Sequence, residues 1–282
     1  MKHRIDLHMH TNHSDGSLSP SELVILAKEK GLETIAVTDH DTVSGIRECV
    51  SCGGGFGVDI ISGVEIGIKN EESRGLTEIH ILGYFIDCKN RKILSVFEKI
   101  NQSKRNWLAK QIKKLSGIGI EVSSEDVKRT AGLAAPSRPH IWRAIEKNSQ
   151  NKISKDDFFN RTKIGGDLFV RKDFELPLED CIKIIHEAGG LAVLAHPGFH
   201  SIEKVVEVCV GAGIDGLEVK YFYGFGKGED AKVVRRINEL AEKHKLLKTG
   251  GSDFHDKNHG ANLGSVPVPY EWLEKMKKRI QK

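Results

Sequence analysis

The sequence predicts an α/β fold with about seven short strands, arranged as a barrel or as an open sheet. Two observations support this prediction. Short apolar runs alternate with helical patterns over residues 1–90 and 176–282, as in chains whose helices return to new parallel strands. Over residues 91–175 helical periodicity dominates and no strand of comparable strength is found, which indicates a helical insertion.

The individual elements follow from apolar periodicity and from helix start and stop signals. The predicted strands comprise residues 4–10, 34–38, 59–64, 78–82, 191–194, 216–219 and 246–249. The predicted helices comprise residues 21–30, 94–115, 137–147, 154–162, 178–188, 202–211 and 230–243, with one more at the carboxyl end. The first helix has the clearest start, because Ser19 suits the N-cap, Pro20 the first position and Glu22 the capping box.

The composition argues against several classes of protein. The 43 basic and 39 acidic residues give a net charge of +4, which does not mark a membrane or nucleic-acid binder. No apolar run approaches the roughly 20 residues of a membrane span, and no signal sequence is seen, so we expect a cytoplasmic protein. Five scattered cysteines make no disulfide framework, and Cys49 with Cys52 lacks the second pair of a zinc site.

Histidine and acidic residues occur at most of the predicted strands. Alternation over residues 4–10 puts His8 and His10 on the same face of the first strand. The other candidates are Asp15, His40, Glu65, His80, His196, Asp253 and His255. Because the carboxyl ends of barrel strands meet at one face, we expect these side chains to converge. Burying them uncoordinated would be costly, and metal ions would offset that cost.

The candidate ligands also indicate which metals and which chemistry to expect. Mixed imidazole and carboxylate ligands favour Mn, Fe or Zn over Mg or Ca, and nine ligands are too many for one ion. Three dications would leave the cluster at about +3, which suits a phosphate dianion together with a hydroxide. The residues therefore predict the hydrolysis of a phosphoester.

The order of the motifs resembles that of the PHP (polymerase and histidinol phosphatase) family of metal-dependent phosphoesterases. The matching motifs are His8-Met-His10, Ser14-Asp15-Gly16, Thr38-Asp39-His40-Asp41, Gly63-Val-Glu65, His80-Ile-Leu-Gly83-Tyr84, Ala195-His196-Pro197-Gly198 and Gly251-Ser252-Asp253-Phe254-His255. The resemblance implies a distorted (β/α)7 barrel domain formed by residues 1–90 and 176–282. It also implies that the helical insertion domain, residues 91–175, covers the active site.

The resemblance further implies a site for three divalent metal ions, with Mn as the first choice and Fe or Zn as alternatives. Glu65 would bridge two of them. One ion would be held by His8, His10, Glu65 and Asp253, a second by Glu65, His80 and His196, and a third by Asp15, His40 and His255. A hydroxide activated by these metals would attack phosphorus, without a side-chain nucleophile.

The insertion resembles that of family members acting on nucleoside 5′-monophosphates, nucleoside 3′,5′-bisphosphates and short 5′-phosphorylated oligonucleotides. Within Ser137-Arg138-Pro139-His140, Arg138 and His140 would bind the substrate phosphate. His140 and His200 are candidate proton donors. The chain departs from these relatives at Phe199-His200, where they carry Arg after His-Pro-Gly, and over residues 220–223, so substrate identity is the open part of the prediction.

Three alternatives stay open at this point. In the first alternative the substrate is histidinol phosphate, as in the amino-acid branch of the family, although the insertion bearing Arg138 fits nucleotides better. In the second alternative the chain is a metal-binding module without catalysis, although all nine expected ligands are present. Binding of long nucleic acid is the third, and an aromatic content of 6% argues against it. We expect a small phosphorylated partner, no membrane and no long nucleic acid.

Overall fold

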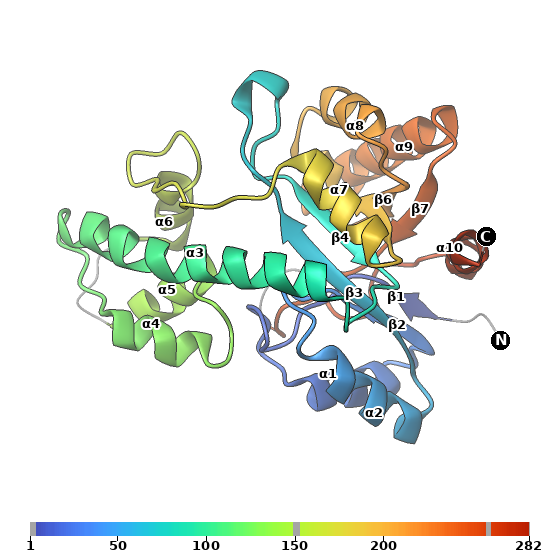
Figure 1. Ribbon diagram of the computed structural model, residues 1–282, viewed down its shortest axis with the longest axis horizontal. Coiled ribbons are helices and arrows are strands. Elements are labelled where there is room, and N and C mark those ends of the chain that lie inside the picture. The colour runs from blue at the N-terminus through green and yellow to red at the C-terminus, as the bar shows by residue number, and fades with distance from the viewer. Residues whose placement is uncertain (1–3, 149–152, 258–260, 282) are drawn as a thin grey trace.

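The computed structural model describes residues 4–148, 153–257 and 261–281, and its strands form one sheet (Figure 1). Seven strands occur in these residues, and their order in the sheet is their order in the chain. They are β1 (Ile5–Asp6), β2 (Thr34–Val37), β3 (Asp59–Gly67), β4 (His80–Tyr84), β5 (Leu191–Leu194), β6 (Gly216–Lys220) and β7 (Leu247–Gly250). Every predicted strand is present, although β1 is shorter than the prediction over residues 4–10.

The chain after β1 closes the sheet against the segment that follows β7. The Leu7 N–H donates to the Gly250 carbonyl at 3.2 Å, and the Asp253 N–H donates to the His8 carbonyl at 2.8 Å. These bonds satisfy backbone groups that two free sheet edges would leave unpaired. The sheet is therefore a nearly closed barrel, which confirms the expectation of a distorted seven-stranded barrel.

One strand of the barrel runs in the opposite direction to the others. β4 is antiparallel to β3 and β5, whereas the remaining neighbouring pairs are parallel. Residues 68–79, between β3 and β4, hold only the 3-10 turn η1 (Glu72–Arg74) and no crossover helix, which a parallel pair would need. The expectation of parallel strands throughout is wrong here. His80 opens β4, and because β4 is reversed its first residue lies where the parallel strands end.

Ten helices are found in the described residues. They are α1 (Pro20–Glu29), α2 (Ile46–Phe56), α3 (Arg91–Ser116), α4 (Ser124–Ala131), α5 (Arg138–Glu146), α6 (Lys155–Thr162), α7 (Leu178–Glu187), α8 (Ile202–Gly211), α9 (Lys227–Lys243) and α10 (Tyr270–Ile280). None of them combines the length and the apolar character that crossing a bilayer requires. The sequence patterns did not predict α2 and α4, because α2 ends in a run of glycines and α4 is short and polar.

Apolar side chains fill the inside of the barrel and the space between its strands and the outer helices. Leu7, Ala36, Leu82 and Val193 point inward, and α10 packs against this group through Met276. A larger cluster joins the outer faces of the strands to α1, α2, α7, α8 and α9. The interior is thus a packed core, and the space for chemistry is left at the ends of the strands.

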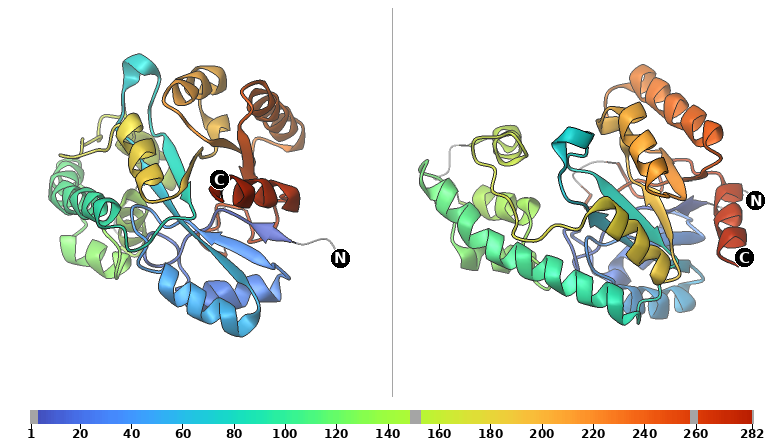
Figure 2. Two further views of the ribbon diagram at one scale, coloured as in Figure 1. Left: turned by 45° about the vertical axis from the view of Figure 1, so that its right-hand side comes forward. Right: turned by 45° about the horizontal axis from the view of Figure 1, so that its top comes forward.

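The helix α3 runs from the barrel to the remaining helices of the insertion (Figure 2). Its first half packs on the barrel core through Phe97. Its second half joins α4, α5 and α6 in a separate apolar cluster that includes Trp107 and Phe158. The chain then returns beside β3, where the Lys69 N–H donates to the Leu176 carbonyl at 2.7 Å. The insertion therefore has an apolar core of its own and two connections to the barrel.

The substitution Phe158→Ala should unfold the insertion more readily than the barrel. Phe158 is fully buried in the insertion core, and truncating a buried Phe costs about 3–5 kcal/mol. We expect amide hydrogen exchange to become faster in α4, α5 and α6, while β2 and β3 keep their protection. Leu23→Ala, in the barrel core, is the control and should speed exchange in the barrel. An equal increase everywhere in the Phe158 variant would show that both parts unfold together.

Candidate metal centre and active site

Glu65, in β3, is a buried carboxylate surrounded by imidazoles at the mouth of the barrel. Five histidines from four strands, two of them after β1, lie within 3.4 Å of its oxygens. Oε2 is 3.2 Å from Nε2 of His8, 3.2 Å from Nε2 of His10 and 3.4 Å from Nδ1 of His40. Oε1 is 2.8 Å from Nδ1 of His80 and 3.1 Å from Nε2 of His196. Glu65 therefore lies at the centre of the cluster.

Two aspartates extend the cluster on either side of His10. Oδ1 of Asp253 is 3.0 Å from Nε2 of His10 and 3.1 Å from Nε2 of His8. Oδ1 of Asp15 is 3.2 Å from Nε2 of His255 and 3.9 Å from Nδ1 of His10. The structure thus brings together all nine side chains that the sequence singled out, in one continuous cluster.

The nine side chains divide into overlapping groups whose nitrogen and oxygen atoms face one another. In three groups the possible ligand atoms all lie within 4.8 Å of each other. These groups are His8, His10, Glu65 and Asp253; His10, Asp15, His40 and His255; and His40, Glu65 and His80. The first is the predicted set, and the second is the predicted set with His10 added. His196 lies outside these groups but shares Oε1 of Glu65 with His80.

Nδ1 of His196 is buried and makes no hydrogen bond, and Oδ1 of Asp15 makes none beyond facing Nε2 of His255 at 3.2 Å, which is costly for polar atoms. Mixed imidazole and carboxylate donors at this spacing suit Mn, Fe or Zn. A bound ion would satisfy the unpaired atoms, so the residues present fit a metal.

The charges of the cluster are strongly coupled. Burial opposes ionisation of Glu65, but the imidazoles of His40 and His8 outweigh it and hold the pKa of Glu65 well below its usual range. Burial also opposes protonation of His10, yet its hydrogen bonds to Asp253 and Glu65 raise the pKa of His10 to about 10. For His40 burial prevails and lowers the pKa to about 4. Without metal, protons on selected histidines thus neutralise the carboxylates.

Glu218, in β6, is a member of the site that the sequence analysis did not single out. Its Oε1 lies 2.9 Å from Nδ1 of His8, and its Oε2 accepts the backbone N–H of His196 at 2.8 Å. It is fully buried, as is His8. A carboxylate on Nδ1 fixes the ring so that Nε2 faces Glu65, which is the usual arrangement around metal ligands. The only signal in the sequence was an acidic residue in an otherwise apolar strand.

Tight backbone geometry accompanies this arrangement. The backbone φ angle is 54° at Asp253 and 28° at His196, and residues other than glycine rarely adopt such positive values. At Gly251 an added Cβ would meet the backbone nitrogen of His8 at 2.4 Å, so only glycine fits beside β1. Such strain is typical of sites where function fixes the side chains.

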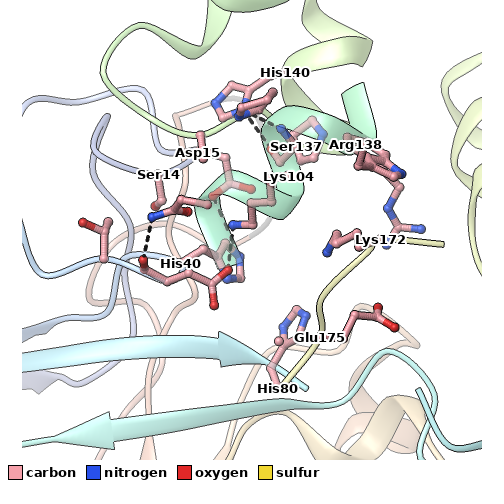
Figure 3. Close-up of a pocket in the computed structure, with 18 of the residues that line it drawn as sticks. Ser14, Asp15, His40, His80, Lys104, Ser137, Arg138, His140, Lys172 and Glu175 are labelled. Carbon is pink, nitrogen blue, oxygen red and sulfur yellow. Dashed lines mark hydrogen bonds and ion pairs between the residues drawn. The ribbon is translucent and has the colours of Figure 1, made fainter. Parts of the chain in front are cut away.

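A cavity of about 460 Å³ lies between the mouth of the barrel and the insertion (Figure 3). On the barrel side it is lined by Asp15, His40 and His80 of the cluster. On the insertion side it is lined by four cationic residues, Lys104, Arg105, Arg138 and Lys172. The cavity thus joins the candidate metal centre to a positively charged wall, of which the sequence analysis identified only Arg138.

The four cations differ in their partners, and Arg105 lies 2.7 Å from Oε1 of Glu98. Nζ of Lys104 lies 2.6 Å from Oδ2 of Asp41, and the Arg138 guanidinium lies 2.6 Å from Oε1 of Glu78. For Lys172 no ion pair or hydrogen bond of the ammonium group is found within the described residues. Burial and the nearby charge of Lys104 lower the pKa of Lys172. This unpaired cation faces the cavity, where an anion would stabilise it.

The two candidate proton donors lie in different surroundings. His140 lines the cavity, but its Nδ1 accepts the Ser137 backbone N–H at 3.2 Å and so caps α5. His200 follows the 3-10 turn η2 (Pro197–Phe199) and is not among the residues that line the cavity. Burial lowers the pKa of each to about 4. Both imidazoles are therefore mostly uncharged at neutral pH, and their role as proton donors stays a prediction.

The fold and the cluster define a metal-dependent hydrolase built on an α/β barrel. The chain belongs to the PHP family, because the PHP domain matches residues 6–188. The family that the motifs indicated is thereby confirmed.

Three relatives share the chain over nearly its whole length. A 5′-3′ exoribonuclease Rnm from Escherichia coli is 32% identical over 92% of this chain and 87% of the relative. A phosphoribosyl 1,2-cyclic phosphate 1,2-diphosphodiesterase from Eggerthella lenta is 28% identical, covering 93% and 96%. A 3′,5′-nucleoside bisphosphate phosphatase from Chromobacterium violaceum is 28% identical, covering 91% and 88%. All three names describe enzymes that hydrolyse phosphoesters.

The fold has a counterpart among solved structures. A crystal structure from Bifidobacterium adolescentis, provisionally assigned as a metal-dependent phosphoesterase, matches with a TM-score of 0.85 at 26% identity. The match covers 98% of this chain and 96% of that chain. The protein is accordingly a metal-dependent phosphoesterase, a hydrolase acting on ester bonds.

The substitution Glu218→Gln should weaken metal binding while the barrel stays folded. An amide at this position no longer fixes the His8 ring as a carboxylate does, and losing such a partner typically lowers metal affinity about 10- to 100-fold. Titration of the metal-free protein with Mn²⁺ measures the change. Glu239→Gln, on the outer surface of α9, is the matched control and should bind like the unchanged protein. Unaltered affinity in the Glu218 variant would show that other contacts hold the ring.

Metal binding should release protons between about pH 7 and 9. The pKa of His10 is raised to about 10 in the metal-free protein, so the ring is protonated in this range. A ligand imidazole must lose that proton, and the apparent affinity for metal should therefore rise with pH. Calorimetric titration with Mn²⁺ in two buffers of different ionisation enthalpy counts the protons. Heats that do not depend on the buffer would contradict this expectation.

Proposed function

We propose that the protein cleaves the 3′-phosphoester of a nucleotide that also carries a 5′-phosphate. The substrates are nucleoside 3′,5′-bisphosphates and the 5′ ends of short oligonucleotides. The observation that supports this choice is Lys172, a half-buried cation without a partner in the cavity beside the cluster. One phosphate of the substrate would lie at the cluster, and the unpaired ammonium group of Lys172 would bind a second anionic group.

The wall around Lys172 favours a phosphate as that second group. Arg138 and Lys104 line the same cavity. Each is paired with one carboxylate, Arg138 with Glu78 and Lys104 with Asp41. The ammonium group of Lys172 lies among these charges and near Arg138, as its lowered pKa and Figure 3 indicate. A dianion at this wall would accept hydrogen bonds from Lys172 and Arg138 together. A nucleoside 5′-monophosphate has no second phosphate to do so and should be the poorer substrate.

The remaining lining of the cavity suits a nucleoside. Trp107, Leu133 and Phe169 contribute apolar surface on the insertion side. A volume of about 460 Å³ falls in the range of cavities that hold small-molecule ligands. The names of the three relatives describe phosphoesters of a nucleoside, of RNA and of a phosphoribosyl group. Cavity, charge and relatives thus support the same class of substrate.

For the cofactor we propose three divalent ions, with Mn preferred over Fe and Zn, held by the nine residues of the cluster. Bound there, the ions would polarise the phosphoryl oxygens and lower the pKa of a water molecule. The chain itself orients the site. Glu218 fixes the ring of His8, and the Tyr221 hydroxyl donates to Oδ2 of Asp253 at 2.8 Å. Lys172 and Arg138 hold the distant phosphate, so that the reacting phosphate reaches the cluster in one orientation.

The proposal is tested by metal analysis followed by assays of product release. With Mn²⁺ supplied, adenosine 3′,5′-bisphosphate and a 5′-phosphorylated diadenylate should be hydrolysed faster than adenosine 5′-monophosphate, adenosine 3′-monophosphate or histidinol phosphate. Equal rates for adenosine 3′-monophosphate and the bisphosphate would remove the need for a second phosphate. Fastest turnover of histidinol phosphate would replace the nucleotide by that substrate.

The substitution Lys172→Met should lower kcat/KM for adenosine 3′,5′-bisphosphate by roughly 10- to 100-fold, the value of one charge-assisted hydrogen bond. Turnover of adenosine 3′-monophosphate, which lacks the 5′-phosphate, should change little. Lys113→Met, at an exposed position on α3, is the matched control and should leave both values unchanged. A similar loss with both substrates would show that Lys172 does not bind the 5′-phosphate.

A further inference from the structure

Four aromatic residues form a continuous surface beside the cluster, called here the aromatic rim. They are Phe199, Tyr221, Tyr223 and Phe225. The ring centroids of Phe199 and Phe225 lie 5.6 Å apart, and the ring of Tyr223 lies 5.1 Å from Phe199 and 5.6 Å from Phe225. Phe199 and Phe225 are each 49% exposed, so the rim presents large aromatic faces to solvent.

The aromatic rim is continuous with the candidate metal centre. The ring of His196 lies 5.9 Å from that of Phe199 and 5.5 Å from that of Tyr221. The hydroxyl of Tyr221 donates to Asp253, another member of the cluster. A molecule whose phosphate lies at the cluster therefore has the rim within reach of a group attached to that phosphate.

The rim and the cavity lie on different sides of the cluster. The cavity is lined by segments that follow β1 and β2, by the hairpin of β3 and β4, and by the insertion. The rim comes from the segments that follow β5 and β6, which Figure 1 shows away from the insertion. Neither Phe199 nor Phe225 lines the cavity. Two separate surfaces thus flank the position of the reacting phosphate.

The rim is held in place before any ligand binds. Tyr223 is buried, and its hydroxyl accepts the Gly198 N–H at 3.2 Å. A Cβ at Gly198 would meet the Tyr223 ring at 2.5 Å, so the glycine permits this packing. Oδ1 of Asp230 accepts the Phe225 N–H at 2.9 Å and fixes the loop before α9. Two exposed rings on a fixed support can bind a flat ligand at little cost in entropy.

Resting on the function proposed above, we propose that Phe199 and Phe225 hold the base of the second nucleotide of an oligonucleotide. Because their rings are nearly perpendicular, at 86°, the base stacks on the face of one ring and meets the edge of the other. The first nucleoside occupies the cavity, with its 5′-phosphate at Lys172 and its 3′-phosphodiester at the cluster. The next nucleoside is then attached on the side of the rim. Aromatic faces bind any base, because every base has a π-face. The residues at 199 and 225 thereby extend the enzyme from bisphosphates to a phosphodiester.

The reaction on such a substrate needs only water. A water oxygen bonds to the phosphorus of the diester, and the bond from phosphorus to the 3′-oxygen of the first nucleoside breaks. The 3′-oxygen takes up a proton. The products are a nucleoside 5′-monophosphate from the cavity and a nucleotide with a 5′-phosphate at the rim. Cleavage of a bisphosphate follows the same course, with inorganic phosphate in place of the second nucleotide.

The test compares substrates that differ only on the side of the rim. They are a 5′-phosphorylated diadenylate, the same molecule with an abasic second residue, and adenosine 3′,5′-bisphosphate. In the unchanged protein the diadenylate should be cleaved with a higher kcat/KM than its abasic analogue. Phe199→Ala or Phe225→Ala should lower kcat/KM for the diadenylate by roughly 5- to 150-fold, the range for one base stack. Hydrolysis of the bisphosphate and the metal content should stay unchanged.

The matched control is Phe222→Ala. Phe222 belongs to the same loop and is 52% exposed, but it lines a different groove together with Val234 and Trp272. Its removal should leave all three substrates unaffected. Equal rates on the diadenylate and its abasic analogue would overturn the stacking role and leave the proposed function standing. Loss of bisphosphate hydrolysis in the Phe199 variant would also overturn it. Failure of the metal-loaded protein on every substrate would overturn both proposals.

Discussion

The structure depends on one buried carboxylate that faces five imidazoles. Glu65 lies within 3.4 Å of histidines carried by β4 and by the chain after β1, β2 and β5. A charge taken out of water in this way is tolerable only if its partners are held rigidly around it. The nearly closed barrel provides that rigidity, since each histidine lies in a strand or a few residues after one, and each strand is bonded to its neighbours. The chemistry of the site and the closure of the sheet are therefore parts of the same constraint.

Much of this arrangement can be read from the sequence, because strand ends are marked by local signals. Apolar runs followed by His, Asp or Glu located all nine members of the cluster, and apolar periodicity located every strand. The direction of β4 could not be read, because periodicity carries no direction. It follows instead from a connection between β3 and β4 that is too short for a crossover helix. The helix α2 was missed because Gly53, Gly54 and Gly55 disfavour helices, and only Gly53 packs against the chain that enters β3.

The residues that orient the cluster and those that line the substrate cavity were harder to predict from the sequence than the nine residues of the cluster. Glu218 lies in the middle of an apolar strand, where nothing local distinguishes a carboxylate that holds His8 from one that meets solvent. Lys104 and Lys172 come from opposite ends of the insertion and meet only because α3 and the returning chain pass the same cavity. Contacts between distant segments leave no periodic signal. The substrate recognition that we propose rests mainly on such contacts.

The reversed strand β4 has a consequence for how this architecture can change over evolution. The chain leaves β4 at the end of the barrel remote from the cluster, and α3 carries it back along the outside to the mouth (Figure 1). The roof of the cavity is thus positioned by the length of one helix. Adding or deleting a helical turn, about 5.4 Å, would rescale the space for substrate without altering a single metal-facing side chain. The height of the cavity above the cluster can therefore change while the nine residues of the cluster stay the same.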